Sequence, residues 1–305
     1  DDDGNQEIGA PVNNVWLLNN RFYNNQRWEG IDFHHGNNVI IMGNHVENCK
    51  VGLMMGAGST DFLTELSGRN IVIKDNRFIR GNGLNTDGAG IILNGSGTTE
   101  STYVGWMENI LIEGNTVDGF GGTVANTNTG AITLYLLKRC RVVNNEIKNY
   151  KQHGVCLYYN TQDVDIVRNW FGDLSGYTPD GADISSCVAT RSTGHIGTTI
   201  ADNISYASSP DKAPGVFLRA SDNNASSYQL HRNQLNITRT GNLKSGAAIP
   251  IEWDVIPASQ VIGKYGDIAY DKKGTPRWVV TSPKQGFGSL SATQTIILTD
   301  AASGT

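Results

Sequence analysis

Alternating apolar and polar residues recur along the chain in a short pattern that closes on an asparagine. Residues 14–20, 38–44, 70–76 and 109–115 are clear copies, and weaker copies follow. Alternation of period two is typical of a β-strand that buries one face. The asparagines that close the eight copies are Asn20, Asn44, Asn76, Asn115, Asn145, Asn169, Asn203 and Asn233. A repeat of this kind predicts a solenoid of stacked coils.

The first seven copies are each followed by a second strand pattern that opens with glycine, at Gly30, Gly52, Gly90, Gly130, Gly154, Gly181 and Gly215. Successive closing asparagines lie from 24 residues apart (20 to 44) to 39 residues apart (76 to 115). We therefore expect coils of two or three strands with inserted loops of variable length. The closing asparagine is expected to turn the corner of each coil, because it tolerates the left-handed conformation, and to stack on its copies as an internal amide ladder.

From residue 13 to residue 256 this repeat resembles the pectate-lyase-like superfamily of right-handed β-helices. The resemblance implies an all-β fold, a right-handed parallel β-helix of about eight coils over residues 1–258. The superfamily includes pectinases, alginate and chondroitin lyases, epimerases and the trimeric tailspike depolymerases of bacteriophages. It therefore implies a polysaccharide substrate more firmly than it implies one reaction.

The repeat stops near Ser259, and residues 266–270, 277–281 and 295–299 form three separate strand patterns. We expect a C-terminal β segment over residues 259–305. It resembles the C-terminal parts of phage tail fibres and spikes, which implies a homotrimer on a virion tail, or otherwise an extracellular protein. A simple cap that shields the last coil is the alternative. The first residues have no signal-peptide features, so what lies upstream stays open.

Composition excludes several classes of partner. The net charge is −5 and the basic residues are scattered, which argues against nucleic acid. No apolar run approaches the roughly 20 residues that cross a bilayer, so we expect no membrane insertion. The four cysteines, Cys49, Cys140, Cys156 and Cys187, stand far apart, so we expect buried thiols and neither a metal site nor a disulfide framework. No residue pattern indicates a cofactor.

The glycine-opened strands should present a flat outer face on which a linear polymer can lie across successive coils. Glycoside hydrolysis needs two carboxyl groups on either side of the scissile bond. Asp180 and Asp183 belong to one coil, at a turn and on its strand, and are the favoured catalytic pair. Glu252 and Asp254 in the last coil are the second choice. A third set, Asp32 with His34 and Glu29, lies nearer the end of the stack and is less favoured.

Residues on neighbouring coils supply the other groups that sugar recognition needs. Tyr158 and Tyr159 are candidates for stacking on a pyranose ring, as are Tyr135 and other aromatic residues. Arg219 could contact a sugar carboxylate. Asn85-Thr86-Asp87 and His153-Gly154 resemble two motifs of the polygalacturonases, which implies catalytic roles for Asp87 and His153. The paired aspartates of that family are missing between them, where this chain has Asn128 and Thr129.

Three functions remain open from the sequence. The leading hypothesis is a tailspike-like endoglycosidase that hydrolyses a bacterial surface polysaccharide through Asp180 and Asp183. The second is a lyase, in which His153 or Tyr158 removes a proton next to a uronate carboxylate that Arg219 neutralises. The third is a spike or adhesin that binds glycan without cleaving it. Outward apolar residues, among them Met54, Ile92 and Phe217, favour assembly into a trimer.

Overall fold

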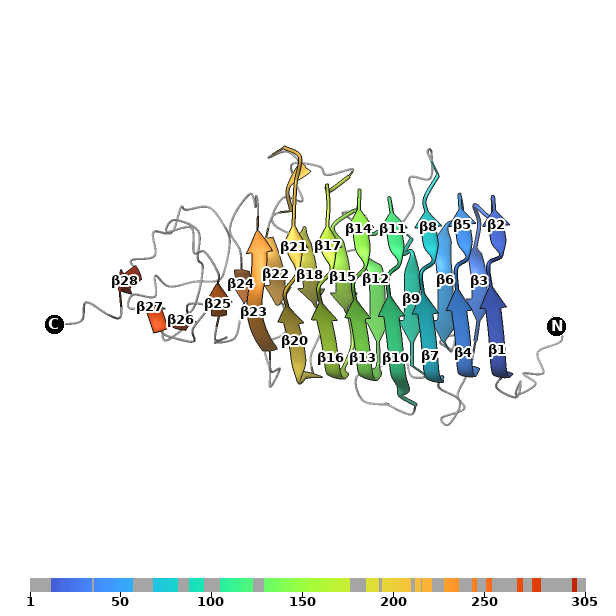
Figure 1. Ribbon diagram of the computed structural model, residues 1–305, viewed down its shortest axis with the longest axis horizontal. Helices are drawn as coiled ribbons and strands as arrows, with labels where there is room; N and C mark the ends of the chain where they lie inside the picture. The colour runs from blue at the N-terminus through green and yellow to red at the C-terminus, as the bar shows by residue number, and fades with distance from the viewer. Residues whose placement is uncertain are drawn as a thin grey trace.

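The structure is a computed structural model in which three parallel β-sheets run the length of a solenoid (Figure 1). It describes residues 12–34, 36–56, 68–81, 88–95, 105–122, 129–175, 185–191, 194–209, 212–214, 216–220, 228–235, 243–245, 251–253, 268–270, 276–280 and 298–300. Each coil supplies one strand to each sheet, and each strand pairs in parallel with its equivalent one coil further on. The expected right-handed parallel β-helix is confirmed.

The first sheet holds the strands of the asparagine-closed repeat. They are β1 (Val12–Leu18), β4 (Gly36–Met42), β7 (Arg69–Lys74), β10 (Met107–Glu113), β13 (Leu137–Val143), β16 (Thr161–Val167), β19 (His195–Ile196), β20 (Thr198–Ala201) and β23 (Tyr228–Leu235). Short strands that follow each asparagine make up the second sheet. They are β2 (Arg21–Tyr23), β5 (His45–Glu47), β8 (Arg77–Ile79), β11 (Thr116–Asp118), β14 (Glu146–Lys148), β17 (Trp170–Phe171) and β21 (Ile204–Ser205).

The third sheet carries the glycine-opened strands. They are β3 (Glu29–Phe33), β6 (Val51–Gly56), β9 (Ile91–Asn94), β12 (Gly130–Tyr135), β15 (His153–Leu157), β18 (Ser186–Thr190), β22 (Val216–Ala220) and β24 (Leu243–Ser245). These eight strands match the expected number of coils. In the sixth coil, however, the pattern at residues 181–185 was expected to form the strand, and the structure places that strand at β18, residues 186–190.

Identical positions of successive coils stack in register, so the core consists of columns of apolar side chains. Ile41, Ile73, Ile112, Val142 and Ile166 form one such column on the first sheet, and all five are fully buried. Each strand contributes alternate residues to this interior, as the period-two pattern predicts. Burial of these side chains is the main stabilising contribution to the solenoid.

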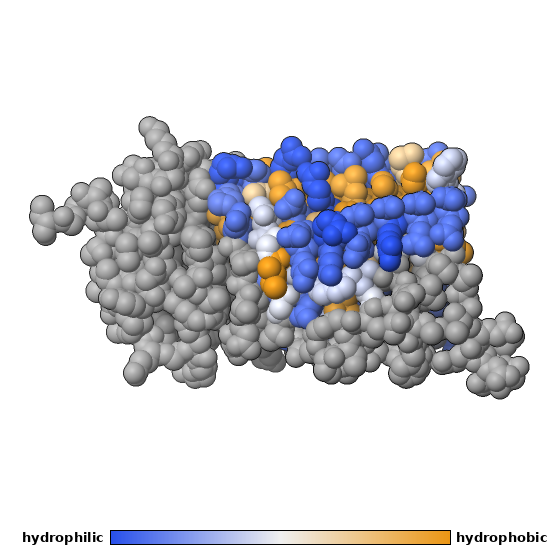
Figure 2. All heavy atoms as spheres, turned by 90° about the horizontal axis from the view of Figure 1, so that it is seen from below, coloured by the Kyte–Doolittle hydropathy of each residue, from blue (hydrophilic) through white to orange (hydrophobic). Residues whose placement is uncertain are grey.

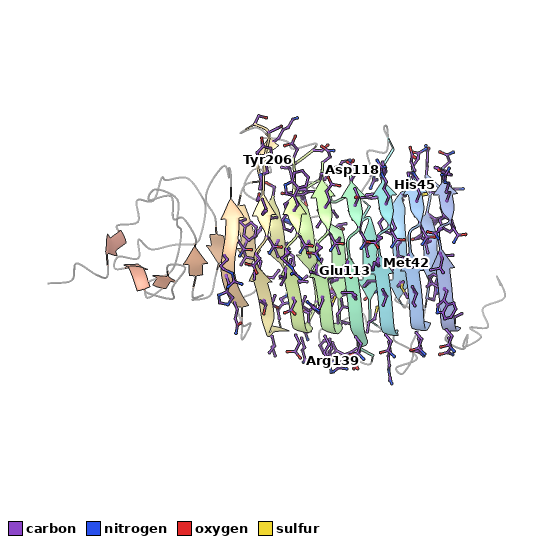
Figure 3. The ribbon with its side chains drawn as sticks, viewed as in Figure 1. Met42, His45, Glu113, Asp118, Arg139 and Tyr206 are labelled. Atoms are coloured by element: carbon purple, nitrogen blue, oxygen red, sulfur yellow. The ribbon has the colours of Figure 1, made fainter. Side chains whose placement is uncertain are left out.

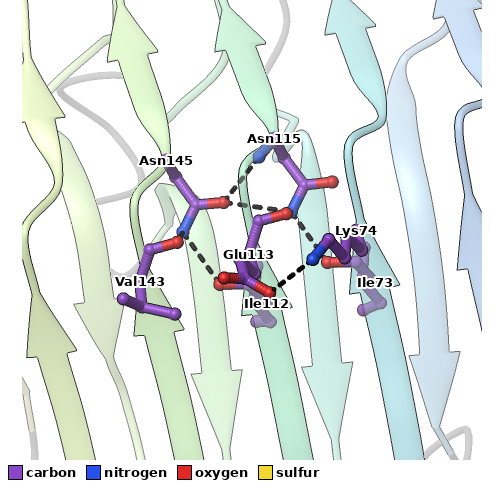
Figure 4. Close-up of polar contacts among 7 residues, drawn as sticks. All are labelled: Ile73, Lys74, Ile112, Glu113, Asn115, Val143 and Asn145. Atoms are coloured by element: carbon purple, nitrogen blue, oxygen red, sulfur yellow. Dashed lines mark hydrogen bonds and ion pairs between the residues drawn. The ribbon is translucent and has the colours of Figure 1, made fainter.

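The closing asparagines form the expected amide ladder at the corner between the first and second sheets (Figure 4). Each Nδ2 donates a hydrogen bond to Oδ1 of the next asparagine, at 2.9–3.2 Å over seven successive pairs. The same Oδ1 accepts a backbone N–H, and from Asn44 onward Nδ2 also donates to a carbonyl of the preceding coil. Each amide therefore satisfies buried backbone groups at a corner.

The ladder asparagines do not themselves adopt the left-handed conformation, so this part of the expectation is wrong. Positive φ angles fall on the residue before each of them, namely Asn19, Gly43, Asp75, Gly114, Asn144, Arg168, Asp202 and Arg232. The preceding residue turns the backbone, and the turn directs the following asparagine into the stack. Because two of these eight are arginines, an unusual conformation for that residue type, the ladder and sheet pairing on both sides evidently hold the turn.

Parallel pairing continues beyond the repeat. β25 (Ile251–Trp253) pairs in parallel with β23, and β26 (Ile268–Tyr270) pairs in parallel with β25. β27 (Pro276–Val280) and β28 (Leu298–Asp300) are antiparallel. The expected boundary near Ser259 lies outside the described residues, so the division at 258 and 259 stays a prediction. The change from parallel to antiparallel pairing occurs between β26 and β27.

Candidate functional site

The outer face of the third sheet carries two columns of outward positions, because residues between them belong to the apolar core. One column consists of Asp32, Met54, Ile92, Thr133, Cys156, Ala189 and Arg219. The other passes through Gly56, Asn94 and Tyr135 and continues with Tyr158 and Arg191, which follow strands β15 and β18. Adjacent positions in such a column lie about 4.8 Å apart. In the first column Thr133, Cys156 and Ala189 are fully buried, whereas Tyr135 and Tyr158 in the second column are partly exposed.

Three tyrosines meet on this face and form what we call the tyrosine cluster, Tyr135, Tyr158 and Tyr159. The ring centroids of Tyr135 and Tyr158 are 5.0 Å apart in an edge-to-face arrangement. Those of Tyr158 and Tyr159 are 4.2 Å apart, and those of Tyr135 and Tyr159 are 5.9 Å apart. All three side chains are half-buried. Rings held against one another present their remaining surface in a fixed orientation, which suits stacking on a sugar.

The hydroxyl groups of Tyr135 and Tyr158 stay protonated at neutral pH. Burial raises the pKa of Tyr158 to about 12, and its hydrogen bond with Tyr159 acts in the same direction. Burial also raises the pKa of Tyr135 well above its usual range. A phenol with such a pKa donates a hydrogen bond and does not serve as a base near pH 7. Tyr158 therefore fits a binding role better than the proton-abstracting role considered from the sequence.

Two arginines lie within electrostatic reach of Cys156, and one of them also reaches the tyrosine cluster. Burial raises the pKa of the Cys156 thiol to about 12, and the positive charges of Arg191 and Arg219 partly oppose that rise. Arg191 also lowers the pKa of Tyr158, so its guanidinium lies within electrostatic reach of the tyrosine cluster. The sequence analysis named Arg219 but missed Arg191. Arg191 directly follows strand β18, at the position equivalent to Tyr158 after β15. Because the sequence pattern placed this strand five residues earlier, Arg191 was not assigned to the outward face.

His153 is placed differently from the expectation. Its side chain is fully buried, and Nδ1 lies 2.9 Å from the Ser186 hydroxyl oxygen on the next coil. A catalytic base must reach the bond that it acts on. A histidine with no exposed surface does not meet that requirement in this structure, so the catalytic assignment of His153 is not supported.

The outward column itself is buried at its centre, since Thr133, Cys156 and Ala189 are fully buried. Phe217 was expected outside, yet it packs in the core with its ring edge-on to Phe171 at 6.3 Å. Ile132 and Leu134 are buried in the core. The outward apolar set that was thought to favour a trimer therefore loses Phe217, while Met54 and Ile92 remain half-buried.

The carboxylates named from the sequence are mostly not placed. Asp87, Asp180, Asp183 and Asp254 lie outside the described residues. Glu252 lies on β25, whose backbone pairs with β23 of the first sheet, so it is on a different sheet from the tyrosine cluster.

In the first coil, Asp32 is exposed, with Oδ2 at 3.5 Å from Nε2 of His34. This is at the end of the stack, as expected. All four cysteines are buried free thiols, in agreement with the sequence analysis. Within the part of the chain that the structure describes, no group of three or more histidine, cysteine or acidic side chains could hold a metal ion. The same part contains no helix long and apolar enough to span a bilayer.

The chain matches no protein-family description, no curated protein and no solved structure. The functional argument therefore depends on the geometry of the site itself.

Proposed function

We propose that this protein is a polysaccharide depolymerase that binds its substrate across the outer face of the third sheet. The observation that carries the proposal is the tyrosine cluster with Arg191 within electrostatic reach. Aromatic rings stack on the apolar faces of sugars, and protonated phenols and guanidinium groups donate hydrogen bonds to sugar oxygens or carboxylates. Arg219 lies two coils beyond Cys156 in the same column, and the intervening Ala189 is fully buried.

Hydrolysis is the proposed reaction, with Asp180 and Asp183 as the acid and its partner carboxylate. Both residues lie in the segment that directly precedes β18, the strand whose outward column holds Ala189 next to Arg219. The lyase alternative is less well supported, because its two suggested bases do not fit: His153 is buried, and Tyr158 keeps its proton at neutral pH.

A tailspike-like homotrimer that acts outside the cell is part of the same proposal. On the outer face of the first sheet, Trp16, Ile40, Val72 and Leu111 stand in register, and Trp16 is 70% exposed. A row of apolar surface crosses the N-terminal coils beside a hydrophilic band (Figure 2). Covering such a row by other copies of the chain would remove it from water. A monomeric mass in solution would contradict the trimer.

Mass spectrometry of digests from a panel of capsules and lipopolysaccharides tests the depolymerase. Hydrolysis gives saturated oligosaccharides, whereas elimination leaves an unsaturated end that absorbs in the ultraviolet. We expect saturated products, and we expect Asp183→Asn to abolish their release while leaving binding of uncut polymer intact. Intact polymer throughout the panel would favour the non-catalytic spike. Cleavage at the wild-type rate by Asp183→Asn would remove the catalytic assignment.

A further inference from the structure

A hollow of about 330 Å³ opens on the outer face of the second sheet, in the first three coils. It is lined by Tyr23 at the end of β2, Glu47 at the end of β5, the asparagines that follow them, Asn24 and Asn48, and Gly81. Its size falls at the lower end of ligand-binding pockets, which begin near roughly 300 Å³. None of these residues belongs to the third-sheet surface described above.

The floor of the hollow is built by the turns that lead from the second sheet to the third. Asn24 and Asn48 both adopt left-handed backbone, and Asn48 Nδ2 donates to Asn24 Oδ1 at 2.7 Å. Gln26 Nε2 donates to Asn48 Oδ1 at 3.3 Å, which fixes that amide further. The third coil has Gly81 beside them, and a Cβ atom there would clash with the Asn48 amide. The glycine therefore lets Asn48 keep its place.

One wall combines an aromatic ring with a fixed carboxylate. The Tyr23 side chain is 48% exposed, and its ring centroid lies 5.5 Å from that of His45. His45 Nε2 in turn lies 2.8 Å from Glu47 Oε2, so the histidine links the tyrosine to the carboxylate. The Glu47 side chain is 44% exposed. His45 projects from β5 on the outer side of the second sheet (Figure 3).

We propose that this hollow is a saccharide-binding site for one or two sugar units, separate from the third-sheet face. A pyranose offers an apolar face and a rim of hydroxyl groups. Tyr23 can stack on the face, and Glu47 can accept two hydroxyl hydrogen bonds, because a carboxylate has about four acceptor positions. The side-chain amides of Asn24 and Asn48 provide both N–H donors and carbonyl acceptors at the floor of the hollow.

The proposal does not depend on cleavage. The tyrosine cluster lies on the third sheet in the fourth and fifth coils, whereas the hollow lies on the second sheet in the first three. A chain with two saccharide sites on different faces could hold one polymer at two points, or two strands of a polysaccharide layer, and its overall affinity would then exceed that of either site. If the hollow proves not to bind sugar, the proposal of a depolymerase on the third sheet is unaffected.

The test measures binding of four probes, the methyl glycosides of glucose, galactose, rhamnose and glucuronic acid, by saturation-transfer difference NMR with the full chain. For at least one probe we expect Tyr23→Ala to weaken binding about fivefold or more, as expected for loss of one aromatic contact. Glu47→Gln should weaken the same probe. Gly81→Ala should weaken it too, through displacement of Asn48, although it leaves the ring and carboxylate in place.

Tyr206→Ala is the matched control, because Tyr206 is similarly exposed at 50% and follows β21, a strand of the same sheet in the seventh coil. It should leave binding unchanged. Tyr158→Ala removes a residue of the third-sheet surface and therefore identifies any probe signal that comes from that surface. Far-UV circular dichroism and the melting temperature establish that each variant is folded. Equal affinity of Tyr23→Ala and the wild-type chain for every bound probe overturns the proposal. So does loss of the signal in Tyr158→Ala alone, or no binding of any probe.

Discussion

Replacing Asn145 by alanine removes one rung from the middle of the buried amide ladder. Asn145 Oδ1 accepts hydrogen bonds from both the backbone N–H and the Nδ2 of Asn115, at 2.9 and 3.0 Å. Its own Nδ2 donates to the carbonyl of Ile112 (Figure 4) and to Asn169 Oδ1 on the next coil. The side chain of Asn115 is fully buried, and alanine cannot replace any of these contacts.

The expected loss of stability follows from the donors that are left without an acceptor. Two donors of Asn115 lose their partner, and each buried polar group without one costs about 1–3 kcal/mol. We therefore expect Asn145→Ala to lower the free energy of unfolding by roughly 2–5 kcal/mol. Asn20 occupies the same position at the exposed end of the ladder, where water replaces what is lost. Asn20→Ala should cost about 0.5 kcal/mol or less.

Unfolding of both variants in guanidinium chloride, followed by far-UV circular dichroism, measures this difference. The comparison is valid if the dependence of the unfolding free energy on denaturant concentration is the same for both. Amide hydrogen exchange supplies a local measure, since the Asn115 N–H should lose protection in Asn145→Ala. The reasoning is refuted if the two variants are destabilised by the same amount, because the ladder would then contribute nothing beyond its surface hydrogen bonds.

Three further changes test other parts of the structure. Gly154→Ala places a Cβ 2.6 Å from Cδ1 and Cε1 of Phe171, so calorimetry should show a loss of about 1–3 kcal/mol; an unchanged melting temperature would contradict the packing. Hydrogen bonding to Arg232 lowers the pKa of Asp202 in the folded chain. The pair therefore stabilises the fold, by less than about 1 kcal/mol, at pH values above the pKa of an unfolded aspartate, and this stabilisation is lost as the pH falls through the pKa of Asp202 in the folded chain. Asp202→Asn should therefore differ from the wild-type chain at pH 7 and match it in acid. Burial raises the pKa of Cys187 to about 11, so iodoacetamide at pH 8 should label it only after unfolding; rapid labelling of the folded chain would argue against its burial.

The coils, the strand order and the amide ladder could be predicted because each depends on a local pattern that repeats. The period-two alternation gave the inner column that includes Ile112, and the spacing of asparagines such as Asn115 gave the ladder. The site was harder to predict. Alternation assigns a residue to one face of a strand, but it does not say whether that face is in contact with solvent, as the buried Cys156 illustrates.

A shift of a few residues in one strand has a larger effect on the site than on the fold. Placing the sixth strand at residues 181–185 instead of 186–190 kept the coil count correct. It assigned Asp183, which lies outside the described residues, to the expected strand and left Arg191 unnoticed, because every side-chain assignment depends on the register. Tyr158 was assigned to the outward side, where it lies, because the preceding strand β15 follows the glycine pattern without a shift.

The most direct test of the central claim is a crystal structure of the Asp183→Asn variant with an oligosaccharide from a polymer that the wild-type chain cleaves. The account predicts sugar density on the outer face of the third sheet, with a pyranose stacked on the tyrosine cluster within reach of Arg191. Sugar bound elsewhere, with Tyr135, Tyr158 and Tyr159 out of contact, would contradict it.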